Sequence, residues 1–270
     1  MGRRIRNWWG KLLGGALGVA LGGGPLGGLL GAVLGHQLDQ GRRRLSGRGR
    51  AVTDDRERAQ MAFFNATFSV MGHLAKVDGR VSEAEIAVAR TVMERMDLDE
   101  AMRQTAIRLF TEGKASDFPL DQVVEQFREA CHRRQTLLQL FVEIQLQAAY
   151  ADGALAPAEE RMLLRICQRL HLAEATFRRL ERMVQAGSRL GASGVTGRGD
   201  LSLRDAYAIL GLAATADEGE VRRAYRRLLS QHHPDKLVAK GLPEEMMKVA
   251  AGKTHEIRQA YDRIRAERGF

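Results

Sequence analysis

Residues 221–241 read VRRAYRRLLSQHHPDKLVAKG, and the pattern of this stretch is the strongest indication of how the last quarter of the chain folds. Its apolar residues recur every three or four positions and predict a helix from about 217 to 231. The opposite face of that helix carries Arg222, Arg223, Arg226 and Arg227. Taken alone, four arginines are typical of a solvated face. The His-Pro-Asp that follows is by itself typical of a turn, because proline fixes φ and aspartate caps the next segment.

Two further helices are predicted around this stretch. Residues 202–212 (SLRDAYAILGL) form a short helix that ends at Gly211, since glycine is favoured just past a helix end. A third helix runs from about 244 to the C-terminus. It turns its apolar face inward, namely Ile257, Ala260, Tyr261 and Ile264. The sequence therefore predicts an antiparallel helical hairpin within 201–270, with His-Pro-Asp in the connecting loop.

These patterns together resemble the J domain, because DAYAILGL, AYRRL and QAYDRI flank the His-Pro-Asp in the expected order. The resemblance implies docking on the ATP state of a DnaK-type Hsp70 and stimulation of ATP hydrolysis in that partner. The implied Hsp70-binding residues are His233, Pro234, Asp235, Lys236, Arg222, Arg223, Arg226 and Arg227. The chain has no Walker A motif. We therefore expect no enzyme activity and no cofactor of its own.

A flexible linker is predicted before this unit, at 186–200. The segment reads AGSRLGASGVTGRGD, with five glycines and two serines in fifteen residues. Such a composition is typical of a tether between domains.

Residues 59–185 predict a second, all-helical domain with an internal repeat. Apolar residues such as Phe64, Phe68 and Met71 recur at spacings of three and four. The segment KVDGRVSEAE at 76–85 is echoed by YADGALAPAE at 150–159. Each copy is typical of a corner between two helices, in which glycine ends one helix and a capping residue or proline begins the next.

The same corners carry acidic residues that allow a second interpretation. Asp78 with Glu83 or Glu85, and Asp152 with Glu159, place oxygen ligands as the end of a calcium loop does. The alternating acidic positions of a complete EF-hand are absent, so these residues are weak metal candidates. The repeat and its Asp-Gly-to-Glu spacing resemble the tellurite-resistance TerB-like helical domain. That resemblance implies the fold and leaves a metal open.

A membrane span is predicted at 12–35, where 24 consecutive residues carry no charge. This length crosses a bilayer core, and it exceeds the apolar region of a signal peptide. A short flank, 1–11, precedes the span, and a basic juxtamembrane segment, 36–58, follows it. Glycines recur every fourth residue in two rows, which predict close helix pairing and a homodimer. The rows are Gly14, Gly18 and Gly22, and Gly23, Gly27, Gly31 and Gly35.

Length and charge restrict the class of protein further. The 270 residues suffice for two modest domains, and the net charge is +9. Residues 1–58 hold 11 basic and 4 acidic side chains, whereas the rest is close to neutral. Juxtamembrane arginines facing anionic lipid explain that excess without a nucleic-acid partner. Cys131 and Cys167 form no CxxC pair, which excludes a zinc ribbon, and we expect both to be buried.

The whole chain resembles the bacterial family of membrane-anchored DnaJ-like proteins, an all-α family with an N-terminal anchor, a TerB-like domain and a C-terminal J domain. The resemblance implies a co-chaperone in the inner membrane, with a short periplasmic N-terminus and cytoplasmic domains. It also implies a link to envelope-stress or capsule-synthesis signalling, through a client or signalling protein that stays open. An alternative is a membrane scaffold or metal-responsive stress protein that acts mainly through the TerB-like domain.

Overall fold

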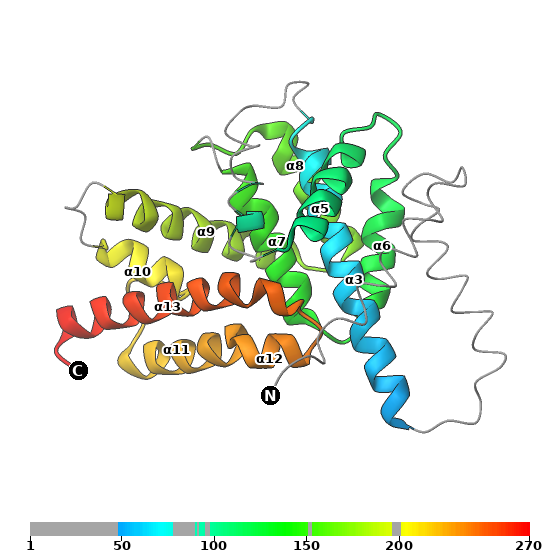
Figure 1. The fold of residues 1–270 in the computed structure, drawn as a ribbon. Helices are drawn as coiled ribbons and strands as arrows, with labels where there is room; N and C mark the ends of the chain where they lie inside the picture. The colour runs from blue at the N-terminus through cyan, green and yellow to red at the C-terminus, as the bar shows by residue number, and fades with distance from the viewer. Residues whose placement is uncertain (1–47, 78–89, 91, 95–97, 151–152, 196–200) are drawn as a thin grey trace.

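The computed structural model describes residues 48–77, 90, 92–94, 98–150, 153–195 and 201–270, and this part is all-α, with no strand (Figure 1). The all-helical fold class is therefore confirmed. The helices are α3 (Arg48–Leu74), α5 (Glu100–Gly113), α6 (Leu120–Ala130), α7 (Gln135–Ala149), α8 (Pro157–Arg169), α9 (Glu174–Val195), α10 (Leu203–Ile209), α11 (Glu218–His232), α12 (Pro234–Ala239), the 3-10 helix η1 (Glu244–Met246) and α13 (Met247–Arg268).

Helix α3 is the centre of the helical domain, and α5, α6 and α7 pack around it (Figure 1). Three fully buried rings join three of these helices. The ring centroid of Phe63 lies 5.7 Å from that of Phe127, and the centroid of Phe127 lies 4.7 Å from that of Phe141. Tilted and edge-on ring pairs of this kind add to the free energy of apolar burial. The apolar period seen in the sequence therefore marks the face of α3 that builds the core.

Two glycines permit a close crossing between α3 and α5. A Cβ at Gly72 would lie 1.9 Å from the carbonyl oxygen of Phe110. A Cβ at Gly113 would lie 1.8 Å from the carbonyl oxygen of Ser69. Because the two glycines lie on opposite helices, each helix gives the other room for its backbone.

The second Asp-Gly corner of the repeat joins α7 to α8. Gly153 has a φ of +100°, which glycine adopts without strain. Pro157 occupies the first turn of α8, and the Glu159 carboxylate accepts a 2.9 Å hydrogen bond from the backbone N–H of Ala156. This corner is therefore the helix-to-helix corner that the sequence predicts. The first corner, with Asp78, Glu83 and Glu85, lies outside the described residues, as does Asp152.

The C-terminal unit is the predicted hairpin of α11 and α13, with α10 packed against α13 (Figure 1). The inward residues Val221, Leu228, Ile257 and Ile264 are fully buried or nearly so. The rings of Tyr225 and Tyr261 stack across the two helices, with centroids 4.0 Å apart.

The prediction of a flexible linker over 186–200 is corrected over its first ten residues, because α9 continues to Val195. Tertiary contacts offset the low helix propensity of glycine there. Ala186 is buried, and a Cβ at Gly187 would lie 3.1 Å from the Glu256 carboxylate on α13. The guanidinium of Arg189 lies 2.8 Å from the Asp205 carboxylate of α10.

The predicted span at 12–35, its flank 1–11 and both glycine rows lie outside the described residues. Among the helices that the structure does describe, none combines the length and the apolar character needed to cross a bilayer. Of the juxtamembrane segment 36–58, the structure describes residues 48–58, which belong to α3.

Candidate functional site

The His-Pro-Asp sequence begins a short helix, which corrects the prediction of a plain loop. His233 is extended, with φ −63° and ψ 123°, and Pro234 occupies the first position of α12. Proline suits that position because its fixed φ is helical and its missing N–H would have no helical partner. The N–H of Leu237 donates to the carbonyl of His233 at 3.0 Å and closes the turn.

This turn presents its polar side chains to solvent. The Asp235 side chain is 79 % exposed and that of His233 is 51 % exposed, with 4.0 Å between Nδ1 and Oδ2. Lys236 is also exposed, and its Nζ donates to Ser230 Oγ at 2.6 Å. Leu237 is fully buried and fastens the turn to the hairpin. A carboxylate on a rigid, exposed turn can reach a cation on a partner protein.

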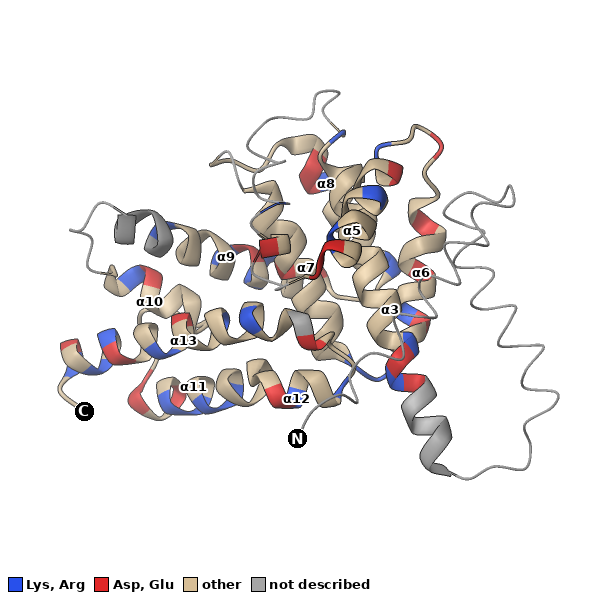
Figure 2. Ribbon diagram, viewed as in Figure 1, with Lys and Arg blue, Asp and Glu red and all other residues tan. Residues whose placement is uncertain are grey.

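A basic face adjoins the turn, because α11 leads directly into it (Figure 2). Arg222, Arg223, Arg226 and Arg227 are all exposed. The helix begins with a capping box, in which Asp217 and Glu220 bond reciprocally to each other's backbone N–H. The Arg222 guanidinium lies 2.5 Å from the Glu218 carboxylate. The structure therefore brings the predicted Hsp70-binding residues together on one open surface.

Reasoning from sequence missed a buried ionic cluster behind this surface, between α7 and the hairpin. The Nζ of Lys253 lies 3.6 Å from Oε2 of Glu143 and 3.4 Å from Oε2 of Glu256. The Nε2 of His232 lies 3.9 Å from Oε1 of Glu143. Burial alone would lower the pKa of Lys253, but the two carboxylates outweigh it and raise that pKa. The sequence feature that points to this cluster is the glutamate, Glu143, inside the apolar run LLQLFVEIQL of α7.

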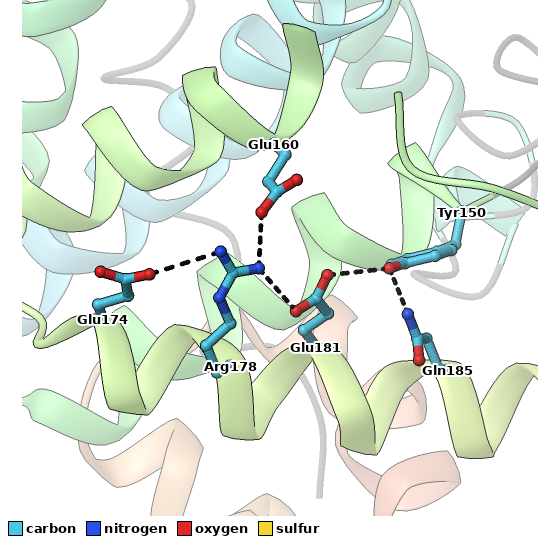
Figure 3. A network of polar contacts seen from close by, with 6 residues as sticks. All are labelled: Tyr150, Glu160, Glu174, Arg178, Glu181 and Gln185. Carbon is cyan, nitrogen blue, oxygen red and sulfur yellow. Dashed lines mark hydrogen bonds and ion pairs between the residues drawn. The ribbon is translucent and has the colours of Figure 1, made fainter. Parts of the chain in front are cut away.

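A second polar network lies beside the Asp-Gly corner (Figure 3). The Arg178 guanidinium lies 2.6 Å from the Glu160 carboxylate, 3.2 Å from that of Glu181 and 3.4 Å from that of Glu174. The Tyr150 hydroxyl donates to Glu181 at 3.1 Å and accepts from the Gln185 amide at 2.5 Å. Three carboxylates thus surround a side chain of the protein itself, the Arg178 guanidinium.

The metal candidates are not brought together within the described residues. Asp78, Glu85 and Asp152 lie outside them, and Glu159 uses its carboxylate at the start of α8. Across the described ranges, no group of three His, Cys, Asp or Glu side chains has the arrangement of a metal site. Cys131 and Cys167 are buried free thiols, as the sequence predicts, and burial raises the pKa of each to about 12.

Three family models match the chain, in the order that the resemblance implied. The co-chaperone DjlA transmembrane domain matches residues 3–45, the tellurite resistance protein TerB matches 64–182, and the DnaJ domain matches 205–267. The first match includes the predicted span and both glycine rows. The last includes the basic face of α11 and the His-Pro-Asp turn.

Full-length relatives carry the same description. The chain is 45 % identical to co-chaperone protein DjlA of Coxiella burnetii over 268 residues, which cover 98 % of this chain and 99 % of that protein. It is 44 % identical to co-chaperone protein DjlA of Escherichia coli K12 over 272 residues, covering 97 % and 99 %. No solved structure matches the chain. With its three domains in this order and such identity over nearly its whole length, the chain belongs to the DjlA family of J-domain co-chaperones.

Proposed function

We propose that the chain binds a DnaK-type Hsp70 in its ATP state and stimulates ATP hydrolysis by that partner. The observation that carries the proposal is the exposed His233–Asp235 turn at the end of the exposed arginine face of α11. The family relatives, which are named co-chaperones, support the same activity.

Each part of this surface has a separate task. The arginine face steers the encounter with an acidic groove and fixes the orientation of the complex. The Asp235 carboxylate then engages a cation near the interdomain linker of the Hsp70. The ATPase residues belong to the partner. The chain accelerates hydrolysis by binding the hydrolysis-competent conformation of the Hsp70 more tightly than the other conformation.

The proposed setting is the cytoplasmic face of the bacterial inner membrane. The span at 12–35 anchors the chain, and the match to the DjlA transmembrane domain supports that anchor. A cytosolic Hsp70 requires the J domain on the cytoplasmic side, which places the short N-terminus in the periplasm. The glycine rows pair two spans into a homodimer, since small residues let helix backbones approach closely.

Single-turnover ATP hydrolysis by a DnaK-type Hsp70 tests the activity, with the full chain held in lipid nanodiscs. We expect the chain to accelerate hydrolysis, and Asp235→Asn and His233→Gln each to reduce that acceleration about tenfold or more. Asp262→Asn is the matched control, because Asp262 is an exposed carboxylate on α13 that pairs only loosely with Arg265, at 3.6 Å. Acceleration that survives in the Asp235→Asn chain contradicts the proposal.

A further inference from the structure

The helical domain and the J domain share a buried contact at one end of the His-Pro-Asp turn. Glu143 of α7 and Lys253 of α13 are only 2 % and 4 % exposed, and each lies within ion-pair distance of the other. His232, which immediately precedes the turn, is also buried against Glu143. Thr254 Oγ1 donates to the carbonyl of His232 at 3.1 Å. The residue before His233 is therefore held from α7 and from α13.

A second contact holds the other end of the turn, where α12 gives way to the loop 240–244. The Gln60 amide of α3 donates to the carbonyl of Leu242 at 3.3 Å. Gly241 has a φ of +101°, and a Cβ built there would lie 2.9 Å from the Cβ of Ala59. At the exposed edge of this contact between α3 and the loop, the Arg56 guanidinium lies 3.4 Å from the Glu244 carboxylate. This loop therefore rests directly on α3.

Both contacts leave the turn itself open. His233, Asp235 and Lys236 are exposed, as are the four arginines of α11. The helical domain therefore covers neither the carboxylate nor the basic face. The helical domain contacts the chain just before the turn, at His232, and just after it, at Gly241 and Leu242.

Because the helical domain contacts the chain on both sides of the His-Pro-Asp turn, we infer that it positions this turn for the Hsp70, with Glu143 and Lys253 as positioning residues. The inference rests on the proposed function and adds to it an active role for the TerB-like domain. A buried ion pair supplies orientation more than net stability, because desolvation of both charges offsets much of their attraction. An ion pair thus suits a contact whose task is to fix one arrangement of two domains.

Positioning has a measurable signature. If only docked chains bind productively, the apparent affinity falls in proportion to the docked fraction, while a saturating concentration still reaches the full effect. Separating the two domains should therefore raise the concentration of the chain that gives half-maximal stimulation of ATP hydrolysis. The plateau, which is the stimulation reached at saturating concentration, should not change. Loss of the Asp235 carboxylate should instead lower the plateau, because that group acts in the complex itself.

Two variants open the interface from the helical domain. Glu143→Lys places a second ammonium beside Lys253, and the new lysine becomes solvated once the domains separate. Ala59→Leu inserts a wedge at the position where Gly241 approaches α3. The charge exchange Glu143→Lys with Lys253→Glu restores opposite charges. Asp121→Asn is the matched control, since its carboxylate lies on α6 and pairs with Arg165 and Arg169 of α8.

The experiment titrates the full chain in nanodiscs against a DnaK-type Hsp70 and records hydrogen exchange of the backbone amides within 240–244, namely those of Lys240, Gly241, Leu242 and Glu244. For both opening variants we expect faster exchange, a half-maximal concentration raised about tenfold and an unchanged plateau. The charge exchange should return both readouts toward wild type, and Asp121→Asn should change neither.

Several outcomes overturn the inference. Faster exchange with an unchanged or lower half-maximal concentration shows that docking does not help the Hsp70. Unchanged exchange in both opening variants shows that these residues do not hold the interface. If the wild-type chain gives no stimulation, or if Asp235→Asn retains it, the proposed function fails instead. The two failures are therefore distinguishable.

Discussion

The ammonium of Lys253 lies 3.6 Å from the Glu143 carboxylate, although the two residues belong to different domains and neither is more than 4 % exposed. The pair therefore forms only when the J domain rests on α7. Since burial of two charges is compensated only in the right geometry, the pair favours one relative orientation of the domains. The J domain of this chain is held against its neighbour, as well as being tethered to it.

Helix α3 links the segment that follows the predicted span to the loop after the His-Pro-Asp turn. Helix α3 begins at Arg48, inside the predicted juxtamembrane segment 36–58, and its residue Gln60 bonds to the loop that follows α12. Residues Arg56, Ala59 and Gln60 of α3 therefore contact the loop that follows the His-Pro-Asp turn. A J domain on a free tether would make none of these contacts with α3.

Removal of the Lys253 charge should weaken the docked fold. Lys253→Met leaves the Glu143 carboxylate buried without its ammonium, and breaking a buried pair costs about 3–5 kcal/mol. Adding Glu143→Leu removes the orphaned charge, so the double variant should recover most of the loss. Urea unfolding of the full chain, monitored by hydrogen exchange in α13, measures the loss of stability in the single and in the double variant. Equal losses in the single and double variants would show that the two charges do not interact.

Periodicity and capping made the hairpin predictable from sequence. Helix α11 starts at a capping box and repeats its apolar residues every three or four positions, and both signals are local. The His-Pro-Asp turn stands out for the same reason. Its helical conformation was missed because proline both ends the preceding helix and begins the next one.

Contacts between domains were not predictable in this way. Helix α9 extends into a glycine-rich stretch because Ala186 and Gly187 pack against other helices, and no local pattern reveals those partners. The Glu143–Lys253 pair joins residues far apart in the sequence. A lone glutamate in an apolar helix signals that a partner exists. It does not identify that partner.

Alanine should have opposite effects at Gly72, inside the crossing of α3 and α5, and at Gly252, outside it. Gly72→Ala places a Cβ 1.9 Å from a backbone oxygen, so the helices must separate, and we expect a loss of about 1–3 kcal/mol. Gly252→Ala is the control, because Gly252 is exposed in the second turn of α13 and nothing lies within 4 Å of the added Cβ. That variant should gain about 0.5–1 kcal/mol from helix propensity. Thermal unfolding compares them, and a neutral Gly72→Ala chain would contradict the crossing.

The two cysteines should be inert in the folded chain. Cys131 and Cys167 are buried, and burial raises the pKa of each thiol to about 12, so little thiolate exists at neutral pH. An aromatic disulfide reagent should label neither thiol in the native chain and both in urea. Ser188→Cys supplies an exposed thiol that should react at once. Rapid labelling of the native wild-type chain would contradict the buried placement.

Acidification should destabilise the docked fold through His232. Burial lowers the pKa of this imidazole below its ordinary value of 6.5, although Glu143 and Glu256 act in the opposite direction, while Lys253 and Arg179 lower it further. The unfolded chain therefore takes up a proton at a pH where the native chain does not. The free energy of unfolding should fall as the pH drops below 6.5, by at most about 1.4 kcal/mol per pH unit.

The comparison of wild type with His232→Gln isolates this effect, because glutamine does not titrate. Half-buried His73 shifts in the same direction, since burial also lowers its pKa, and it remains in both chains. Unfolding free energies measured at about pH 5.5 and about pH 7.5 should therefore differ more in the wild-type chain than in the variant. Hydrogen exchange at 240–244 should show the same contrast, since His232 belongs to the interface with α7. An identical pH dependence in the two chains would show that His232 gains no proton on unfolding over this range, and would contradict its burial as a neutral group.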